Sequence, residues 1–436
     1  MLVSFRVENF RSFASEQEFS LVASPDDSLA ETLIGCEKFD LLRSAVIFGA
    51  NASGKSNLLK ALEAVRNFVI TSATAMNLGD PVPGMVPFRL DKQWREKPCR
   101  FEITALIDGA RYEYGFSATA TRVHSEFLDV CRPGGRLAKK FHRKWNPETG
   151  EPTWEFSGLG KKDEQFLREK TRPNGLLLSR AAELNFEAAG ELFLWLKEGM
   201  WISDFSTLPL QLQLQTARQI KRDPTFRQRV LTFIRDADLG ISDISVSGEP
   251  SSGLAEFMAE VVALGKQLGV ESADELSARL FGVQTTHYDA DGKPISFSLL
   301  KDESNGTQRY FAIVGPILSA IDRGATIIID ELECSMHPLL TRKIVELVND
   351  PDANPRGAQL IFATHDSSLL DSSLFRRDQI WIAEKRQGGA TELFSLYDFE
   401  GDEKPRKSEA FQKQYLAGRY GGVPSFGPVF EDLEVP

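Results

Sequence analysis

Apolar and polar residues alternate in several short runs of the chain, the first of which contains Val3, Phe5 and Val7. A period of two places every second side chain on one face, so each run predicts a half-buried strand. Asp108-Gly109 separates two of the runs, and an Asp-Gly pair in that position predicts a tight antiparallel hairpin. The runs together predict an antiparallel sheet, and they cover residues 1–23 (two strands and a turn), 100–107, 111–116 and 123–130.

A largely apolar run, Ser44 to Phe48, predicts a strand buried on both faces, and we expect residues 1–23 at the edge beside it. The turn Gly49-Ala50-Asn51-Ala52-Ser53-Gly54-Lys55-Ser56 follows, and a helical pattern over residues 54–73 comes next. This turn matches the phosphate-binding pattern Gly-x-x-x-x-Gly-Lys-Ser/Thr in the strand-to-helix setting that the pattern requires. A nucleoside triphosphate is therefore the expected ligand, and a chance glycine-rich turn is the alternative.

Each fixed position of this P-loop has a chemical reason. Gly49 and Gly54 allow backbone conformations that a side chain would forbid, so consecutive N–H groups can converge on phosphates. The N-terminus of the following helix adds the positive end of its dipole. Lys55 can reach the outer phosphates and is also counted as catalytic, while the hydroxyl of Ser56 can ligate Mg²⁺. The expected nucleotide contacts in this segment are Gly49, Asn51, Ser53, Gly54, Lys55, Ser56 and Asn57.

Two later strands end in acidic and imidazole side chains. Residues 325–329 form a β-branched run that ends in Asp330 and Glu331, and residues 358–364 form another that ends in His365. The carboxyl ends of parallel strands meet at one edge of a sheet, where α/β proteins bind ligands. We expect Asp330 to hold Mg²⁺, Glu331 to polarise an attacking water, and His365 to meet the γ-phosphate or order the attacking water. The alternatives are an acidic strand-to-helix turn and a structural histidine.

A second phosphate-binding candidate precedes a helical pattern shortly before Asp330. Ser304, Asn305 and Gly306 lie at the expected helix N-terminus, where a hydroxyl can cap the helix and N–H groups can face an anion. Arg11 and Ser12 lie in the turn of the first strand pair and are further candidates for phosphate contact. On sequence alone, a capped helix and a plain surface turn are the respective alternatives.

The middle of the chain is less regular. Residues 132–175 are rich in charge, glycine and proline, with short strand-like pieces, and predict an exposed insertion. Residues 176–280 have a helical period without sustained heptads and predict a mainly helical arm rather than a long coiled coil. Asp291-Gly292 then predicts a hairpin.

Basic residues of the middle region could line a nucleic-acid groove or face solvent. They are Arg132, Arg136, Lys139, Lys140, Arg143, Lys144, Arg218, Lys221, Arg222, Arg227 and Arg229.

Composition narrows the setting in which the chain works. Its 436 residues carry a net charge of −11, which argues against a surface given over to nucleic-acid phosphates. No apolar run approaches the roughly 18 residues of a membrane helix, and the start of the chain lacks a secretion-signal pattern. We therefore expect a cytoplasmic protein with no membrane contact. The four cysteines lack metal-binding spacing and are expected to be reduced, buried thiols.

Taken together, these motifs resemble those of the ABC-type ATPases, within the branch shared by RecF, Rad50, the SMC proteins and the OLD-type ATPases. The resemblance rests on Asn9-Phe10-Arg11-Ser12-Phe13, on the P-loop, on Ser335-x-His337-Pro338 and on Thr364-His365-Asp366. The segment Tyr415-Leu416-Ala417-Gly418-Arg419-Tyr420-Gly421-Gly422-Val423-Pro424 is similar to the end of AAA-family ATPases from bacterial antiphage defence operons.

The resemblance implies an α/β fold, namely an ABC-ATPase head with a mixed core sheet, a P-loop, an antiparallel subsheet and a mainly helical insertion. It divides the chain into head segments at residues 1–130 and 291–436 and an insertion at residues 131–290. It also makes Ser304 to Gly306 the signature motif, which in this family contacts the γ-phosphate bound to the opposite subunit. By the same resemblance, residues 335–338 are the D-loop and His365 is the switch histidine.

Two departures from the family pattern affect the coupling between nucleotide and arm. The signature segment lacks the family's usual sequence Leu-Ser-Gly-Gly-Gln. No unambiguous Q-loop glutamine is present, and the segment from Leu178 to Asn185 in the corresponding place carries Arg180 instead.

The resemblance implies a cytoplasmic ATPase that uses ATP and Mg²⁺ and assembles as a head-to-tail dimer or a higher homo-oligomer. The first functional hypothesis is the sensor or motor subunit of an antiphage defence system. No nuclease motif follows His365, so a nuclease-like effector encoded nearby would act in trans. The second hypothesis is a RecF-like DNA-repair or DNA-structure sensor that binds duplex DNA. The third is a nucleotide-gated scaffold with little turnover.

Overall fold

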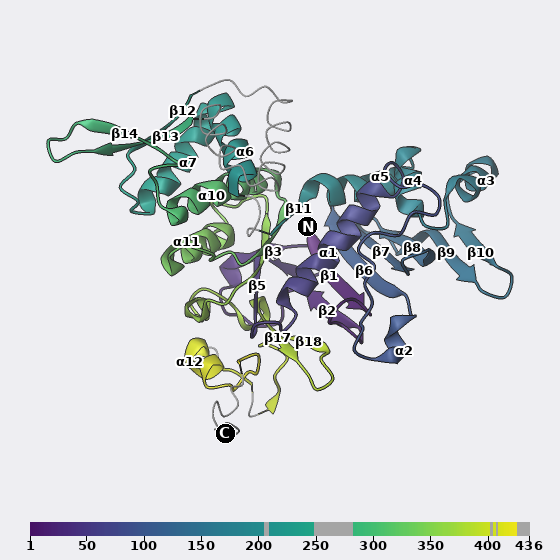
Figure 1. The fold of residues 1–436 in the computed structure, drawn as a ribbon. Helices are drawn as coiled ribbons and strands as arrows, with labels where there is room; N and C mark the ends of the chain where they lie inside the picture. Colours follow the sequence, from purple (N-terminus) through teal and green to yellow (C-terminus); the bar gives the residue numbers. More distant parts are fainter. Residues whose placement is uncertain (205–208, 248–281, 402–403, 407–408, 425–436) are drawn as a thin grey trace, which may run out of the picture. The chain divides into compact units, whose positions relative to one another are not determined.

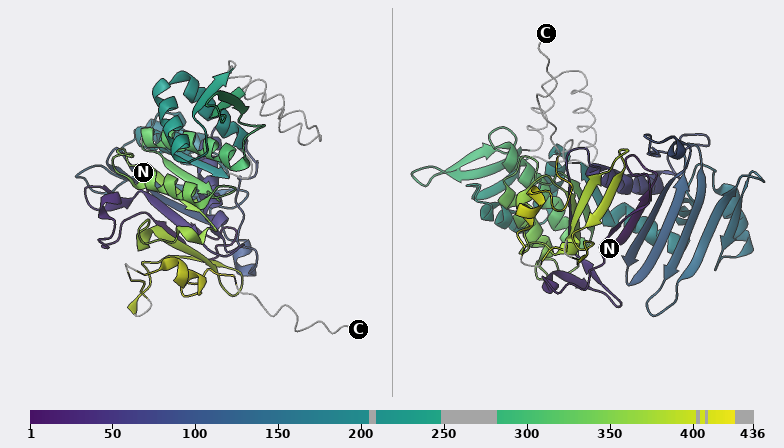
Figure 2. Two further views of the ribbon diagram at one scale, coloured as in Figure 1. Left: turned by 90° about the vertical axis from the view of Figure 1, so that its left-hand side faces the viewer. Right: turned by 90° about the horizontal axis from the view of Figure 1, so that it is seen from below.

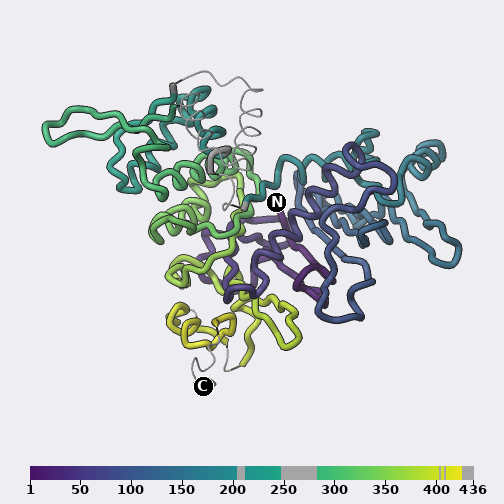
Figure 3. Tube along the Cα trace, viewed as in Figure 1, coloured from purple at the N-terminus to yellow at the C-terminus, as the bar shows by residue number. Residues whose placement is uncertain are grey.

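The computed structural model describes residues 1–204, 209–247, 282–401, 404–406 and 409–424, and Figure 3 traces them along the chain. The chain forms two compact units. Unit 1 comprises Met1–Ile202, Gly324–Asp330 and Val348–Pro436, and unit 2 comprises Ser203–Arg323 and Glu331–Leu347.

Unit 1 contains a seven-stranded antiparallel sheet. In order across the sheet, the strands are β10 (Glu151–Phe156), β9 (Ala138–Asn146), β8 (Val123–Cys131), β7 (Ala110–Ala118), β6 (Cys99–Ile107), β1 (Leu2–Glu8) and β2 (Gln17–Ser20). The right-hand view of Figure 2 shows these strands side by side. Asp108 and Gly109 have φ values of 48° and 78° between β6 and β7, as a two-residue type I′ turn requires.

This sheet confirms the strands predicted by alternation and corrects two expectations about their surroundings. The strand pair within residues 1–23 forms the edge of this antiparallel sheet and does not pair with the strand that precedes the P-loop. Most of residues 132–175 are exposed or partly exposed, as expected, but they are no separate insertion, because β9 and β10 continue the same sheet and Phe141 is buried. The segment boundary expected at residue 130 therefore falls at the end of an inner strand of this sheet.

A second, six-stranded sheet carries the P-loop strand. Its strands in order are β11 (Met200–Asp204), β15 (Thr326–Asp330), β16 (Gln359–Ala363), β5 (Ser44–Phe48), β17 (Ile380–Lys385) and β18 (Thr391–Ser395). Strands β15, β16, β5 and β17 run parallel, and β18 pairs antiparallel with β17. All five residues of β5 are buried, as its continuous apolar pattern predicts.

Helix α1 (Lys55–Thr71) begins directly after the P-loop and joins the two sheets through one buried core (Figure 1). Leu58, Leu62 and Val65 of α1 belong to the same apolar cluster as Phe101 of the antiparallel sheet and Ile361 of β16. Burial on both sides fixes the direction of the helix that starts at the phosphate-binding turn.

Further elements surround this core. They are η1 (Ala30–Thr32), β3 (Leu33–Gly35), β4 (Asp40–Leu42), α2 (Lys92–Arg95), α3 (Lys161–Lys170), α4 (Leu177–Glu183), α5 (Glu187–Leu194), the π-helical turn η2 (Trp195–Gly199), η3 (Ser367–Leu369), η4 (Arg377–Gln379) and α12 (Phe411–Leu416). Among the described residues, no helix combines the length and apolar character needed to cross a membrane.

Unit 2 is built from helices and a small antiparallel sheet. Its elements are α6 (Pro209–Arg222), α7 (Pro224–Asp236), β12 (Asp243–Ser247), β13 (Gly282–Tyr288), β14 (Pro294–Ser298), α10 (Asn305–Arg323) and α11 (Pro338–Asn349), whose last two residues belong to unit 1. Strands β13 and β14 form the hairpin expected around Asp291-Gly292. The predicted helical arm is helical in α6 and α7, while residues 248–280 of that prediction lie outside the described residues.

A buried ion pair ties the antiparallel sheet to the N-terminus of α4. Glu126 on β8 accepts hydrogen bonds from the N–H groups of Leu177 and Leu178 at 2.7 and 2.8 Å and from the hydroxyl of Tyr114 at 3.0 Å. Arg143 on β9 lies 2.8 Å from the same carboxylate, and the two side chains are 5% and 0% exposed. Because every partner is buried, loss of one charge would leave the other without solvent or counter-charge.

We predict that Glu126→Gln lowers the free energy of unfolding by about 3 kcal/mol, because the charge of Arg143 would remain buried and unpaired. The matched control is Lys139→Gln in the neighbouring pair Lys139–Glu155, whose side chains are 61% and 69% exposed. That control should change stability by about 0.5 kcal/mol or less. Chemical denaturation measures both variants, and equal losses would contradict the role given to burial.

Candidate functional site

Three segments that are far apart in the sequence meet at the carboxyl edge of the parallel sheet. Phe362 of β16 lies opposite Val46 of β5 on one side and Ile329 of β15 on the other. The P-loop begins directly after β5, Asp330 is the last residue of β15, and His365 is the second residue after β16. Since adjacent parallel strands are about 4.8 Å apart, the register brings the three predicted site segments to one edge, with β16 between the other two.

The P-loop needs glycine at both ends for steric and conformational reasons. Gly49 and Gly54 have φ values of 152° and 114°, which side chains rarely allow. A Cβ atom on Gly49 would overlap the carbonyl oxygen of Ala383, and one on Gly54 would overlap the hydroxyl of Thr391. The loop can therefore approach its neighbours this closely only with glycine at these positions.

Lys55 holds the loop from inside. Its side chain is buried, and its ammonium donates to the carbonyl oxygens of Gly49 at 2.7 Å and Ala50 at 3.1 Å. Ser53 is buried, and its hydroxyl has no hydrogen-bond partner among the described residues. Ser56 is half-buried in the first turn of α1. A buried cation and an unsatisfied hydroxyl in a glycine-framed turn fit a phosphate chain.

A chain of polar side chains supports the P-loop from two other segments. The amide of Asn57 donates to the hydroxyl of Ser12 at 2.8 Å, and that hydroxyl lies 2.8 Å from the hydroxyl of Thr391. Thr391 in turn donates to the carbonyl oxygen of Ser53 at 2.6 Å. Asn57, expected to contact nucleotide, therefore uses its amide within the protein.

Thr391 is a site residue that sequence reasoning missed. It is the first residue of β18 and follows a glycine-rich turn, and no local pattern marks it as a partner of the P-loop. Only the tertiary pairing of β17 with β5 and β18 brings it there.

The phosphate contact of Arg11 stays a prediction, and the described contacts of Arg11 are with groups outside the P-loop. Arg11 has a φ of 51°, and its N–H donates to the carbonyl of Val86 at 2.8 Å. Arg11 also lines a hollow together with Lys60 and Glu63 of α1. The neighbouring Ser12 is the residue of this turn that contacts the P-loop helix.

Asp330 offers an unsatisfied oxygen at the sheet edge. Its Oδ1 atom is buried and has no hydrogen-bond partner in the described part of the chain. An orphaned carboxylate oxygen is costly unless a cation satisfies it. A carboxylate and the hydroxyl of Ser56 are hard oxygen donors of the kind that Mg²⁺ prefers, so these residues fit the predicted metal role.

Glu331 and His365, which are predicted to be catalytic together with Lys55, are exposed. Glu331 adopts a left-handed conformation with a φ of 53°, and its carbonyl accepts from the N–H of Cys334 at 3.0 Å, so the chain turns sharply after Asp330. His365 follows Thr364, whose N–H donates to the carbonyl of Ile47 at 3.1 Å. Unusual backbone conformations of this kind concentrate at functional sites.

In unit 2, the predicted signature segment packs against the predicted D-loop. The hydroxyl of Ser304 accepts from the N–H of Thr307 at 3.1 Å and so caps α10, while Ser304 and Asn305 remain exposed. A Cβ atom on Gly306 would lie 2.8 Å from the carbonyl oxygen of Ser335, so glycine is required for this contact. The capped helix predicted from sequence is therefore present, with α10 beginning at Asn305.

The basic residues considered for a nucleic-acid groove are partly neutralised. Several form ion pairs with acidic neighbours, which lowers the positive potential available to phosphates. The pairs are Arg132–Glu191, Lys139–Glu155, Arg143–Glu126, Arg227–Asp243 and Arg229–Asp322.

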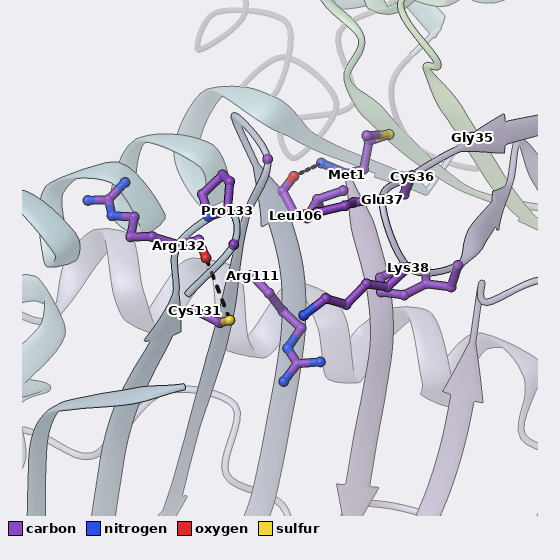
Figure 4. Close-up of a pocket in the computed structure, with 13 residues that line it drawn as sticks. Met1, Gly35, Cys36, Glu37, Lys38, Leu106, Arg111, Cys131, Arg132 and Pro133 are labelled. Carbon is purple, nitrogen blue, oxygen red and sulfur yellow. Dashed lines mark hydrogen bonds between the residues drawn. The ribbon is translucent and has the colours of Figure 1, made fainter. Parts of the chain in front are cut away.

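A cavity of about 450 Å³ lies elsewhere in unit 1, between the β3–β4 loop and the turns after β6 and β8 (Figure 4). Cys36, Cys131, Arg111 and Arg132 are among its lining residues, and none of the predicted site residues in the described chain lines it. Of the four free cysteines, only Cys99 is buried, where burial raises the pKa of its thiol to about 12. The expectation that all four are buried is therefore wrong for the other three.

Comparison with known protein families finds a match that includes the strand and turn of the P-loop. The model of a family described as "AAA domain, putative AbiEii toxin, Type IV TA system" matches residues 44–371, a span that contains the P-loop, Asp330 and His365. A search among curated proteins returned no match.

The chain is also similar to solved structures. An SMC head bound to the C-winged helix domain of ScpA is 12% identical and has a TM-score of 0.41, with coverage of 90% of this chain and 97% of that one. The SMC head domain from Thermotoga maritima is 12% identical with a TM-score of 0.37, covering 90% and 98%. The recombination mediator protein RecF-ATPrS in the RecFOR pathway is 13% identical with a TM-score of 0.29, covering 90% and 98%. The predicted fold class, α/β with a mixed P-loop sheet and an antiparallel subsheet, is confirmed.

We predict that Asp330→Asn stabilises the nucleotide-free protein by about 1 kcal/mol, because the substitution removes the charge of a half-buried carboxylate whose Oδ1 atom has no hydrogen-bond partner among the described residues. The same variant should lose the rise in melting temperature that Mg²⁺ with a non-hydrolysable ATP analogue gives the parent protein. Asp352→Asn, at an exposed position of the same unit, is the matched control and should change neither value. Thermal unfolding with and without ligand measures both effects, and an unchanged ligand response in Asp330→Asn would contradict the metal role.

Proposed function

The chain belongs to the family described as "AAA domain, putative AbiEii toxin, Type IV TA system", and from this premise we propose that it hydrolyses ATP to control an effector protein in a bacterial antiphage defence system. The motifs of the sequence resemble those of ABC-type ATPases of the RecF, Rad50 and SMC branch, and the proposal places the chain in that branch. The observation that carries the proposal is the meeting of the P-loop, Asp330 and His365 at one sheet edge.

In this proposal the P-loop binds the triphosphate of ATP. The N-terminus of α1 and the ammonium of Lys55 face negative charge, and Lys55 exchanges its carbonyl partners Gly49 and Ala50 for phosphate oxygens. Ser56 and Asp330 hold Mg²⁺, which neutralises charge on the phosphate oxygens when bound. The unpaired Oδ1 atom of Asp330 supports this assignment.

Glu331 then accepts a proton from the water that attacks the γ-phosphate. Its position directly after Asp330 and its left-handed backbone turn the chain at the sheet edge, which supports a role next to the phosphates. His365, at the end of the neighbouring strand β16, donates a hydrogen bond to the γ-phosphate. In this proposal, hydrolysis uses residues that follow three adjacent parallel strands. They are Glu331 after β15, His365 after β16 and Lys55 in the P-loop after β5.

The complete site needs a second copy of the chain. Ser304 and Asn305 are exposed at the N-terminus of α10. The N-terminus of this capped helix can therefore meet an anion that is bound to a second copy of the chain. We propose that this segment meets the γ-phosphate bound to the partner in a head-to-tail dimer or a larger ring. ATP binding would close the assembly and hydrolysis would open it.

The defence role rests on the resemblance of residues 415–424 to the end of antiphage ATPases. The effector would be a nuclease-like protein that acts in trans in the cytoplasm. A DNA-structure sensor is the first alternative, and the ion pairs of Arg132, Lys139 and Arg143 weigh against it because they use up basic charge. A nucleotide-gated scaffold is the second alternative.

We predict that Glu331→Gln keeps ATP binding but lowers turnover by about 100-fold or more, because the attacking water loses its proton acceptor. The variant should accumulate as a closed dimer with ATP, seen by light scattering, while phosphate release measures turnover. Glu346→Gln, in an exposed pair with Arg342, is the matched control and should hydrolyse ATP normally.

Undiminished turnover in Glu331→Gln would refute the catalytic assignment. Binding without turnover in the parent protein would favour the scaffold. Stimulation of turnover by duplex DNA with a steep salt dependence would favour the DNA sensor, and no DNA retention at low salt would exclude it.

A prediction for the biological role concerns phage challenge. Cells that carry this chain together with its neighbouring reading frame should plate phage at about 100-fold lower efficiency, which Lys55→Ala should abolish because the P-loop cation is lost. The chain without its neighbour should give no protection. Protection that survives Lys55→Ala would separate the phenotype from ATP binding and overturn the proposed coupling.

A further inference from the structure

The segment that closes the described chain packs on the entrance of the P-loop. Tyr415 lies in α12 and is buried, and its ring centroid is 5.8 Å from that of Phe48. Phe48 is the last residue of β5 and immediately precedes Gly49. A residue near the end of the chain therefore contacts the point at which the phosphate-binding turn begins.

The hydroxyl of Tyr415 donates a hydrogen bond to the carbonyl oxygen of Gly422 at 3.0 Å and lies near the N–H of Gly49. Burial raises the pKa of Tyr415 to about 12, while the N–H of Gly49 acts in the opposite direction. The phenol consequently stays protonated at neutral pH and keeps its bond to Gly422.

Gly422 is held in this position by its own contacts. Its φ is 67°, its N–H donates to Glu384 at 3.3 Å, and a Cβ atom would lie 2.6 Å from the side chain of Ile382. The same Cβ position is 3.4 Å from the Cα atom of Gly49. Only glycine lets the segment fit between β17 and the P-loop, so the hydroxyl of Tyr415 fixes a glycine that packs directly beside Gly49.

We propose that Tyr415 is a positioning residue of the nucleotide site, which fixes the P-loop entrance in its phosphate-binding form before nucleotide arrives. Lys55 already holds the carbonyl of Gly49, and Tyr415 holds Gly422 beside the Cα atom of the same glycine, so Gly49 is restrained from two sides. Glycine loses more backbone freedom on ordering than other residues do, and restraint in the free protein lowers the cost of binding. The consequence for affinity rests on the proposed ATP-binding function.

The ring and the hydroxyl of Tyr415 have separable tasks. The ring fills the apolar space beside Phe48, which phenylalanine would fill equally well. Among the described residues, the hydroxyl donates to the carbonyl oxygen of Gly422, which packs beside Gly49. Tyr415→Phe therefore removes the restraint on Gly49 and keeps the packing.

The experiment compares Tyr415→Phe with Tyr397→Phe, a tyrosine of the same unit whose ring contacts Arg377 and Lys404. In the nucleotide-free protein, amide hydrogen exchange in a peptide covering residues 46–54 should become about tenfold faster in Tyr415→Phe. Affinity for a fluorescent ATP analogue with Mg²⁺ should fall about three- to tenfold, with KM raised and kcat little changed. Tyr397→Phe should match the parent protein in all of these values.

The two readouts separate this proposal from the proposed function. Unchanged exchange at residues 46–54 in Tyr415→Phe, or unchanged affinity despite faster exchange, would overturn the positioning role. If the parent protein bound no nucleotide and Lys55→Ala behaved identically, the proposed function would fail, while the exchange result would still decide whether Tyr415 restrains the loop. Gly422→Ala serves as a second variant, since displacing Gly422 should speed exchange in the same peptide, and slower or unchanged exchange there would count against the restraint.

Discussion

The parallel register of β15, β16 and β5 is the constraint on which the site depends. Strand register is set by backbone hydrogen bonds and by burial of both faces, and Ile329, Phe362 and Val46 are all buried. A slip by one residue would turn each side chain to the other face and move Asp330 and His365 away from the level of the P-loop. The apolar core of the sheet therefore sets the geometry of the polar groups at its edge.

Local motifs could be predicted from sequence because their chemistry is local. The strand, glycine-rich turn and helix around Lys55 lie within a single stretch, and the β-branched strand before Asp330 is equally self-contained. The Asp108-Gly109 hairpin was predictable for the same reason, since two residues determine the turn. The fold class followed from these parts and from the order in which they occur.

The supporting shell of the site could not be predicted, because it depends on tertiary approach alone. Thr391 and Tyr415 reach the P-loop through β17, which pairs with β5, and nothing in their own sequence neighbourhood indicates that contact. Arg143 illustrates the converse error. Its basic neighbours suggested a surface, yet it is buried against Glu126, because the hairpin of β9 and β10 extends the sheet. Charge patterns in sequence do not report which side chains the fold encloses.

The residues that support the P-loop lie far after it in the sequence, and this order bears on how the protein is synthesised. The glycine-rich turn leaves the ribosome early, but the residues that support it, Thr391 and Tyr415, emerge hundreds of positions later. A nascent chain therefore carries the glycine-rich turn long before the side chains that hold it in place. The turn gains its full set of supporting contacts only after the later strands β17 and β18 have been made.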